Sequence, residues 1–451
     1  MAFWSHSLPQ RGINRNIATI SGLCTIRLVK KGILPYWTFM FGTQQRQNRI
    51  LFAVAVAAAG LIHVSIAASQ IFLGLGLVLL LVFCQKLNFP RIWIPLAAFF
   101  LWTALADVLS PDPWGGRAQL KKFFVFFFIP LLYSVFSRQF SKVYYVMVAW
   151  TVTATASGLW GLAQFVFKYL HAKKTGENFY VTYVGHRITG FESHWMTFGA
   201  LQLSVLLLLL AQWFFSNRKM PGWAYGSIFV LSATILLGET RSIWLATVPA
   251  VFYLIWFWHP KMTLTLPVIA IIAFAVAPPT TRERLRSLVE PHGETDSNRH
   301  RIVTFRTGVE MVKAHPWFGI GPEQIRRQFD AYVPADIKRP LPVGYYGHLH
   351  NIYVQYAAER GIPGLMLLLW MIGVAVFDCF RAIVRIGNER SQQLFFLHGT
   401  VAVIISILVG GLFEYNLGDS EVLMMFTSVL ALGYAAADNV GTNIVAERLA
   451  A

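Results

Sequence analysis

Long runs of apolar residues, separated by short polar breaks, dominate the chain from residue 50 onward. Several of these runs approach twenty residues with few or no charges, which is the length that a helix needs to cross about 30 Å of hydrocarbon. The runs are continuous rather than alternating, so they predict helices and not the strands of a closed barrel. We expect about twelve membrane spans, at roughly residues 50–67, 69–85, 92–110, 123–136, 143–167, 196–215, 224–238, 242–258, 262–278, 363–379, 394–412 and 421–437.

The composition agrees with this pattern. Of the 451 residues, 56% are hydrophobic and only 13% are charged, and the mean hydropathy is +0.53. A soluble domain has about a quarter of its residues charged. The three cysteines, Cys24, Cys84 and Cys379, lie far apart and suggest neither a disulfide framework nor a metal site. No cleavable signal is expected, because the first long apolar run begins only near Leu51.

The net charge of +17 raises the question of a nucleic-acid partner. The positive charges, however, lie in short loops between the apolar runs, as residues that set membrane topology do, so no nucleic acid is expected. With twelve spans these loops fall on one side, which should be cytoplasmic together with both termini. They comprise the N-terminal segment, Lys86/Arg91, Arg138/Lys142, Arg218/Lys219, Lys261 and Arg381/Arg385/Arg390.

The expected topology divides the chain into five parts. A basic cytoplasmic segment (1–49) precedes nine spans (50–278), a periplasmic loop domain (279–362), three closing spans (363–437) and a cytoplasmic tail (438–451). In the loop domain, Ile302, Phe305, Val309 and Val312 repeat at helical spacing and predict an amphipathic helix over 298–314. A second helix is expected around 351–360, before the Gly-rich turn at 361–364 leads into the tenth span. The shorter outer segments are 111–122, 168–195, 239–241 and 413–420.

Several arginines and acids fall on the outer side of this topology. Arg241 stands in a short turn between two very apolar helices, where an Arg costs free energy unless it is paired, and Glu239 is a possible partner. Arg241 is either a snorkelling interfacial residue or an anion-binding residue whose guanidinium group grips phosphate oxygens. For Arg187 and Arg301 a structural role and a binding role both remain open.

The segment His348-Leu-His350-Asn351 places two imidazoles just before a helix that Asn351 can cap. Zinc needs three or four ligands, and no HExxH motif or outer cysteine is present, so no metal is expected. A neutral His is well suited to accept a proton from a hydroxyl group near neutral pH. Glu414 and Asp419 could orient His350, bridge to the arginines or cap the last helix.

These residues resemble the O-antigen ligase family, the Wzy_C-type superfamily. The resemblance rests on TRSIWLA, RIVTFRTGVEMVKAHPWFGIGPEQ and HLHNIYVQYAAERGIPGL, and on the order of a span block, a large outer loop and a few closing spans. It covers about residues 187–420. It implies an all-α, GT-C-like polytopic membrane glycosyltransferase that uses lipid-diphosphate-linked glycans in the periplasm. The sequence has TRS where many members have SRG, which keeps the Arg but changes the turn.

The resemblance also implies roles for particular residues. Arg241 and Arg301, with Arg187 as a further contact, would bind the donor diphosphate. His350 would be the essential histidine, with His348 as the alternative, and Glu239, Glu414 and Asp419 would support them.

The implied activity is the lipopolysaccharide-forming transfer of a glycan from undecaprenyl diphosphate to the lipid A–core oligosaccharide. It would take place at the bacterial inner membrane, among membrane lipids, without a cofactor and with inversion at the anomeric carbon. An O-antigen polymerase and a protein O-oligosaccharyltransferase share this donor and site, and both remain alternatives. A transporter fits less well, because the spans contain almost no acids.

Overall fold

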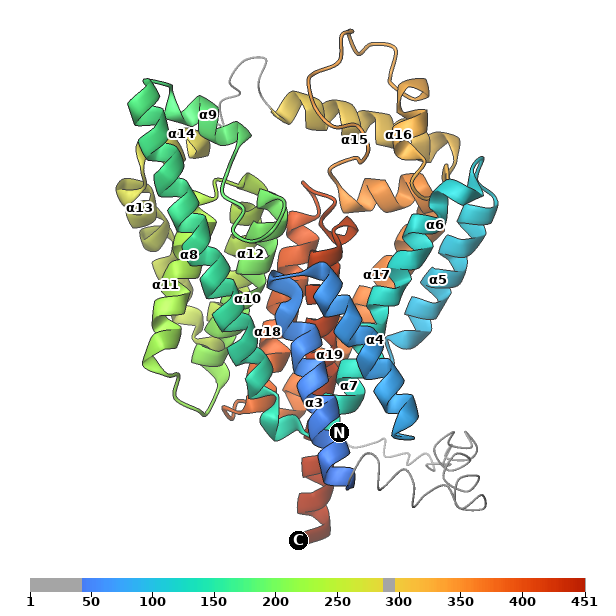
Figure 1. Cartoon of the computed structure of the whole chain (residues 1–451), viewed down its shortest axis with the longest axis vertical. Helices are drawn as coiled ribbons and strands as arrows, with labels where there is room; N and C mark the ends of the chain where they lie inside the picture. Colours follow the sequence, from blue (N-terminus) through green and yellow to red (C-terminus); the bar gives the residue numbers. More distant parts are fainter. Residues whose placement is uncertain (1–42, 287–296, 451) are drawn as a thin grey trace, which may run out of the picture.

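A computed structural model of the chain describes residues 43–286 and 297–450. The described part is built from α-helices with short 3₁₀ segments, and its long helices run along the long axis of the molecule (Figure 1). Among the described residues, seven helical stretches are long and apolar enough to cross a membrane: Pro113–Arg138, Phe140–Thr175, Trp195–Phe215, Arg241–Trp258, Ile352–Ile386, Gln392–Gly410 and Ser420–Val440. Shorter apolar helices accompany them at Ile66–Val82, Trp93–Val108, Gly222–Leu237 and Pro260–Val276. The chain is therefore a polytopic membrane protein.

Each apolar window of the sequence contains a helix. These helices are α3 (Gln44–Gly60), α4 (Ile66–Val82), α5 (Trp93–Val108), α7 (Phe128–Arg138), α8 (Tyr144–Thr175), α10 (Trp195–Phe215), α11 (Gly222–Leu237), α12 (Arg241–Trp258), α13 (Leu266–Val276), α17 (Ile352–Ile386), α18 (Gln392–Gly410) and α19 (Ser420–Ala450). The largest hydrophobic core lies between them, with α10, α18 and α19 among its most buried members.

The break between the first two windows was predicted too late in the chain. It lies at 61–65, where Ser65 caps α4 by accepting a hydrogen bond from the Ala68 N–H, and not at the polar pair Ser69 and Gln70 that the sequence suggested. Ser69 is buried inside α4, and its hydroxyl donates to the Ala58 carbonyl at 2.6 Å. Its polarity is satisfied between the two helices, so it does not interrupt either of them.

The outer segment 111–122 is mostly helical. Asp112 accepts a hydrogen bond from the Gly115 N–H and begins α6 (Pro113–Lys122), which continues through the 3₁₀ segment Phe123–Phe127 into α7. The fourth apolar stretch therefore extends beyond the predicted window 123–136 and includes Lys122.

One end of the molecule collects the polar elements. There α9 (Phe179–Gly185), α14 (Pro279–Arg286), α15 (Ser297–Ala314) and α16 (Ile325–Gln328) lie across the bundle, and the end of α19 lies at the opposite end (Figure 1). Helix α15 confirms the helix predicted over 298–314. Its buried face is different from the predicted one, because Val303 and Met311 point into a small outer core while Ile302 and Phe305 remain exposed. This rotation turns His300 and Arg301 toward the interior.

Helix α17 contains both the second outer helix and the tenth span. Asn351 accepts hydrogen bonds from the N–H groups of Tyr353 and Val354, which confirms the predicted cap. The helix breaks at Gly361, where φ is +72°, as the Gly-rich turn predicted. A Cβ atom at this position would come within 1.8 Å of the Trp317 carbonyl oxygen, so the close approach requires glycine.

The predictions for the two ends of the chain can be compared with the structure to different extents. Helix α19 continues to Ala450, so residues 438–450 are helical and continuous with the last predicted span. Of the predicted segment 1–49, residues 44–49 belong to α3 and residues 1–42 lie outside the described part.

Candidate functional site

A cavity of about 1240 Å³ lies at the polar end of the bundle. Its walls come from the end of α6, the beginnings of α10 and α12, helix α15, the segment 340–350 and the segment 410–422. Four of the predicted site residues line it: His348, His350, Glu414 and Asp419. Segments more than two hundred residues apart in sequence therefore meet around one space.

A single carboxylate joins the proposed base to one of the predicted arginines. His350 Nδ1 lies 3.2 Å from Glu414 Oε2, and the other oxygen of Glu414 accepts a hydrogen bond from Arg301 Nη2. Glu414 is only 5% exposed. Burial raises the pKa of this carboxyl, but the charge of Arg301 and the hydrogen bond to His350 outweigh burial and leave the pKa below its usual value. Glu414 is therefore a carboxylate at neutral pH.

The carboxylate defines how the His350 ring can act. With a proton on Nδ1 directed at Glu414, the lone pair of the neutral imidazole is on Nε2. His350 Nε2 is buried and has no hydrogen-bond partner among the described residues. The backbone of His350 has φ +50°, a conformation that costs free energy for a residue with a Cβ. The loop thus holds this ring in one orientation with an unused proton acceptor.

Two further imidazoles flank His350. The rings of His348 and His300 lie 4.1 Å and 5.1 Å from it, centroid to centroid. Burial, and then the neighbouring His350, lowers the pKa of His348 to about 3 and that of His300 to about 4. Both rings are therefore neutral at pH 7. His348 Nδ1 accepts a long hydrogen bond, 3.4 Å, from the His350 N–H, so this nitrogen is engaged within the loop.

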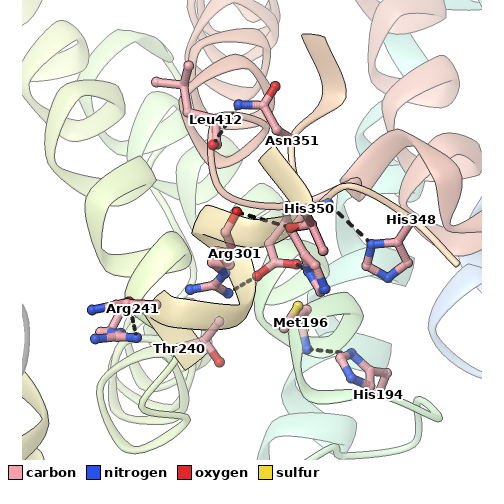
Figure 2. Close-up of polar contacts among 12 residues, drawn as sticks. His194, Met196, Thr240, Arg241, Arg301, His348, His350, Asn351 and Leu412 are labelled. Carbon is pink, nitrogen blue, oxygen red and sulfur yellow. Dashed lines mark hydrogen bonds and ion pairs between the residues drawn. The ribbon is translucent and has the colours of Figure 1, made fainter. Parts of the chain in front are cut away.

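The other two predicted arginines lie in the wall beside Arg301. Arg241 begins α12 and donates from Nη2 to Asn298 Oδ1 at 2.7 Å, one turn before Arg301 on α15. Figure 2 shows Arg241, Arg301, His350 and His348 following one another across the site. All three predicted arginines lie outside the set of cavity-lining side chains, which takes its positive charge from Arg299 and Lys122. The arginines therefore form a cationic wall adjoining the cavity.

Arg187 is the most deeply embedded member of this wall. Its guanidinium group donates to the backbone carbonyls of Val184 and Glu239 and lies 4.7 Å from the ring of Trp195. Burial, and then the charges of Arg284 and Arg301, lowers the pKa of Arg187 to about 9. Because the positive charges of Arg284 and Arg301 act on Arg187, several guanidinium groups lie in this region. Together they favour the binding of an anion there.

The two remaining supporting acids have different surroundings. The Glu239 carboxylate accepts a hydrogen bond from the Thr281 hydroxyl at 3.1 Å, and burial raises its pKa. Asp419 lines the cavity and accepts a hydrogen bond from the Thr197 hydroxyl at 2.8 Å. Burial raises the pKa of Asp419 to about 6.

Four other cavity residues could hardly be predicted from the sequence. His194 and His300 are single histidines beside more conspicuous neighbours, and Lys122 ends a short basic stretch. Glu323, in the left-handed conformation at φ +61°, lines the cavity next to Lys122. Its positive φ, directly after Gly321-Pro322, marks an unusual backbone position that becomes visible only in the structure. Within residues 43–286 and 297–450, no group of three or more His, Cys, Asp or Glu side chains is arranged to hold a metal ion.

Fold and site together define a polytopic membrane protein with an acid–histidine–arginine cluster beside a cavity at one end of its helical bundle. The family model described as O-antigen ligase, Wzy_C, matches residues 226–369, so the chain carries an O-antigen ligase (Wzy_C) domain over these residues. The matched part includes Arg241, Arg301 and His350. Members of this family are lipid-linked glycan ligases and polymerases. A comparison with curated proteins finds no match.

Proposed function

We propose that this protein is an O-antigen ligase of the bacterial inner membrane. It transfers a glycan from undecaprenyl diphosphate to the lipid A–core oligosaccharide on the periplasmic face. The proposal rests on the Wzy_C domain and on one observation above all. His350, Glu414 and Arg301 are joined through a buried carboxylate, and the basic nitrogen of His350 has no partner among the described residues.

His350 is the general base of the proposed reaction. Its Nε2 takes the proton of an acceptor hydroxyl while that oxygen forms a bond to the anomeric carbon of the donor glycan. The bond from the anomeric carbon to the phosphate oxygen breaks, and its electron pair leaves with the diphosphate. Attack opposite to the leaving group inverts the anomeric centre. Glu414 stabilises the imidazolium ion that forms, as the orienting acid of a catalytic triad does.

His350 is a better candidate for this role than His348. The His350 ring has a carboxylate behind Nδ1, whereas Nδ1 of His348 accepts a backbone hydrogen bond. Burial gives His348 a pKa of about 3, which makes it a weak base near neutral pH. The open choice between the two histidines therefore resolves in favour of His350 in this proposal.

The arginines supply the positive charge that the leaving group needs. Guanidinium groups form paired hydrogen bonds with phosphate oxygens, and in a dehydrated site they stabilise developing negative charge without a metal ion. Arg187, Arg241 and Arg301 surround the beginning of α12 and the end of α11. If the donor diphosphate bound there, the anomeric carbon of the attached glycan would lie near the cavity that His350 lines. The reaction is proposed to be metal-independent on this basis.

The same proposal includes a topology. Twelve spans in a GT-C-like arrangement would cross the inner membrane, with residues 279–362 as the periplasmic loop domain. The short basic loops would face the cytoplasm. The placement of α15, α16 and the cavity at one end of the bundle supports this orientation (Figure 1).

Purified protein in lipid nanodiscs, mixed with lipid-linked donor and lipid A–core acceptor, tests the proposal. His350→Ala and Arg241→Ala should abolish glycan transfer while the protein still inserts into the membrane. The control is Arg306→Ala, because Arg306 makes an exposed ion pair with Asp336 on the outer surface of α15. Full activity in either site variant would refute the mechanism, and loss of activity with excess chelator would refute its metal independence. Elongated donor in the absence of lipid A–core would identify a polymerase.

A further inference from the structure

The cavity is also lined by a second polar group, distinct from the arginine wall. Lys122, at the end of α6, donates a hydrogen bond to the Gly418 carbonyl at 3.1 Å, and its Nζ lies 3.9 Å from Glu323 Oε1. Asp419 is close enough to Lys122 and to Glu414 for both charges to act on its pKa. All three side chains, Lys122, Glu323 and Asp419, line the same cavity as His350. The cavity therefore extends from the base to a group of mixed charge.

Hydrogen bonds to neighbouring residues hold these side chains in place. Glu323 Oε1 accepts a hydrogen bond from the Gln119 amide, and the Glu323 N–H donates to the buried Glu359 carboxylate at 3.2 Å. Asp419 is fixed through Thr197. Side chains whose rotamers are locked by such contacts lose little entropy when they bind a ligand. The group is thus preorganised on three separate elements.

The chemistry of this group differs from that of the arginine wall. Two carboxylates and one ammonium group offer both acceptors and a donor, which suits hydroxyl groups and not a polyanion. The aromatic ring of Tyr415 also lines the cavity and offers a flat apolar surface. A sugar matches both features, because its hydroxyl groups form hydrogen bonds and its ring presents an apolar face.

We propose that Lys122, Glu323 and Asp419 form the acceptor-glycan subsite, which presents the acceptor hydroxyl to His350 in the cavity that these residues share. This inference rests on the proposed transferase function, because it assigns the second substrate to the remaining part of the cavity. The donor diphosphate lies against the arginines, and the acceptor sugars bind the mixed-charge group through their hydroxyls.

Binding measured without turnover tests the subsite. The probes are core oligosaccharide freed of its acyl chains, for the acceptor, and undecaprenyl-diphosphate-linked glycan, for the donor. Each is titrated alone onto full-length protein in nanodiscs by calorimetry. Asp419→Asn and Glu323→Gln should each raise the acceptor Kd about tenfold, since each removes a charged hydrogen-bond partner. The donor Kd should stay within about twofold, which also shows that the variants are folded.

The matched control is Glu310→Gln, which removes an exposed carboxylate paired with Lys313 away from this cavity and should change neither Kd. An unchanged acceptor Kd in both site variants, an equal rise of both Kd values, or no acceptor binding by the wild type would overturn the subsite. If binding follows the expected pattern but the wild type transfers no glycan, the proposed function fails and the glycan-binding site stands.

Discussion

Glu414 is the residue at which the geometry makes its sharpest prediction. Its carboxylate contacts His350 at 3.2 Å and also accepts a hydrogen bond from Arg301, while the residue itself is 5% exposed. Glu414→Gln keeps the size and one acceptor oxygen of the side chain but removes the negative charge. The amide can no longer stabilise an imidazolium ion, and it releases Arg301 from its carboxylate.

The expected size of the effect follows from these contacts. General-base catalysis contributes about 10²–10⁴-fold to a rate, and the base loses most of its contribution when its orienting carboxylate is neutralised. We therefore expect kcat to fall by about 10²–10⁴-fold, or roughly 3–5 kcal/mol of transition-state stabilisation. The donor KM should not rise, because Arg301 keeps its full charge and gains freedom to bind the diphosphate.

Initial rates at varied donor and fixed acceptor concentration separate the two effects. The control is Asp336→Asn, which also removes a carboxylate paired with an arginine of α15, but on the exposed side of the helix. This control should leave kcat within about twofold of the wild type, since exposed ion pairs contribute little. A kcat within threefold of the wild type in Glu414→Gln, or a loss expressed only in the donor KM, would refute the assignment of Glu414 and His350 as a catalytic pair.

Three further predictions follow from individual residues. Arg241→Lys keeps the charge but loses the planar fork, so the donor KM in the transfer assay should rise at least about tenfold; a wild-type KM would contradict phosphate binding by Arg241. Burial raises the pKa of Asp419 from 3.8 to about 6, so the folded state keeps a proton that the unfolded state releases between these values. Stability should fall as pH rises through this window, so the Tm of the wild type minus the Tm of Asp419→Asn should decrease from pH 4 to 6, because Asn does not titrate; a constant difference would contradict this. Gly361→Ala places a Cβ against the Trp317 carbonyl and should lower the free energy of unfolding by about 2 kcal/mol or more. The control is Gly373→Ala in the same helix, where the space around the residue is open. This change should be neutral or stabilising by up to about 1 kcal/mol. Equal Tm values for these two variants would show that the kink tolerates a side chain.

The helices could be predicted from the sequence because one strong signal determines them. A long apolar run has to be helical in a membrane, and every such window contains a helix. The helix boundaries were less predictable, because a single Ser can lie inside a helix when a neighbouring carbonyl accepts a hydrogen bond from its hydroxyl. Ser69 does this, and the predicted break was therefore several residues away from the real one.

The site could be predicted in its residue types but not in its contacts. The predicted topology placed Arg301, His350 and Glu414 on the same side of the membrane, and the structure brings both Arg301 and His350 within hydrogen-bonding distance of Glu414. Which acid pairs with which base depends on the rotation of α15 and on the path of segment 411–419. The apolar spacing predicted another buried face for α15, so this rotation could not be read from the sequence.

The residues that escaped prediction have ordinary local surroundings. Lys122 follows another lysine at the end of a short helix, where a solvated side chain is the usual explanation. Glu323 belongs to a Gly-Pro turn with no periodic pattern. Both acquire their place only through tertiary contacts with Gly418 and Gln119, which lie far away in the sequence.

In the proposed reaction, His350 accepts the proton of the acceptor hydroxyl beside a diphosphate held by the arginines. A single-turnover measurement tests this role most directly, with donor-loaded wild type and donor-loaded His350→Ala mixed rapidly with excess acceptor. We expect equal donor loading in the two proteins and a transfer rate at least about 10²-fold lower in the variant. A variant that loads the donor and transfers its glycan within threefold of the wild-type rate would contradict the role of His350 as the base.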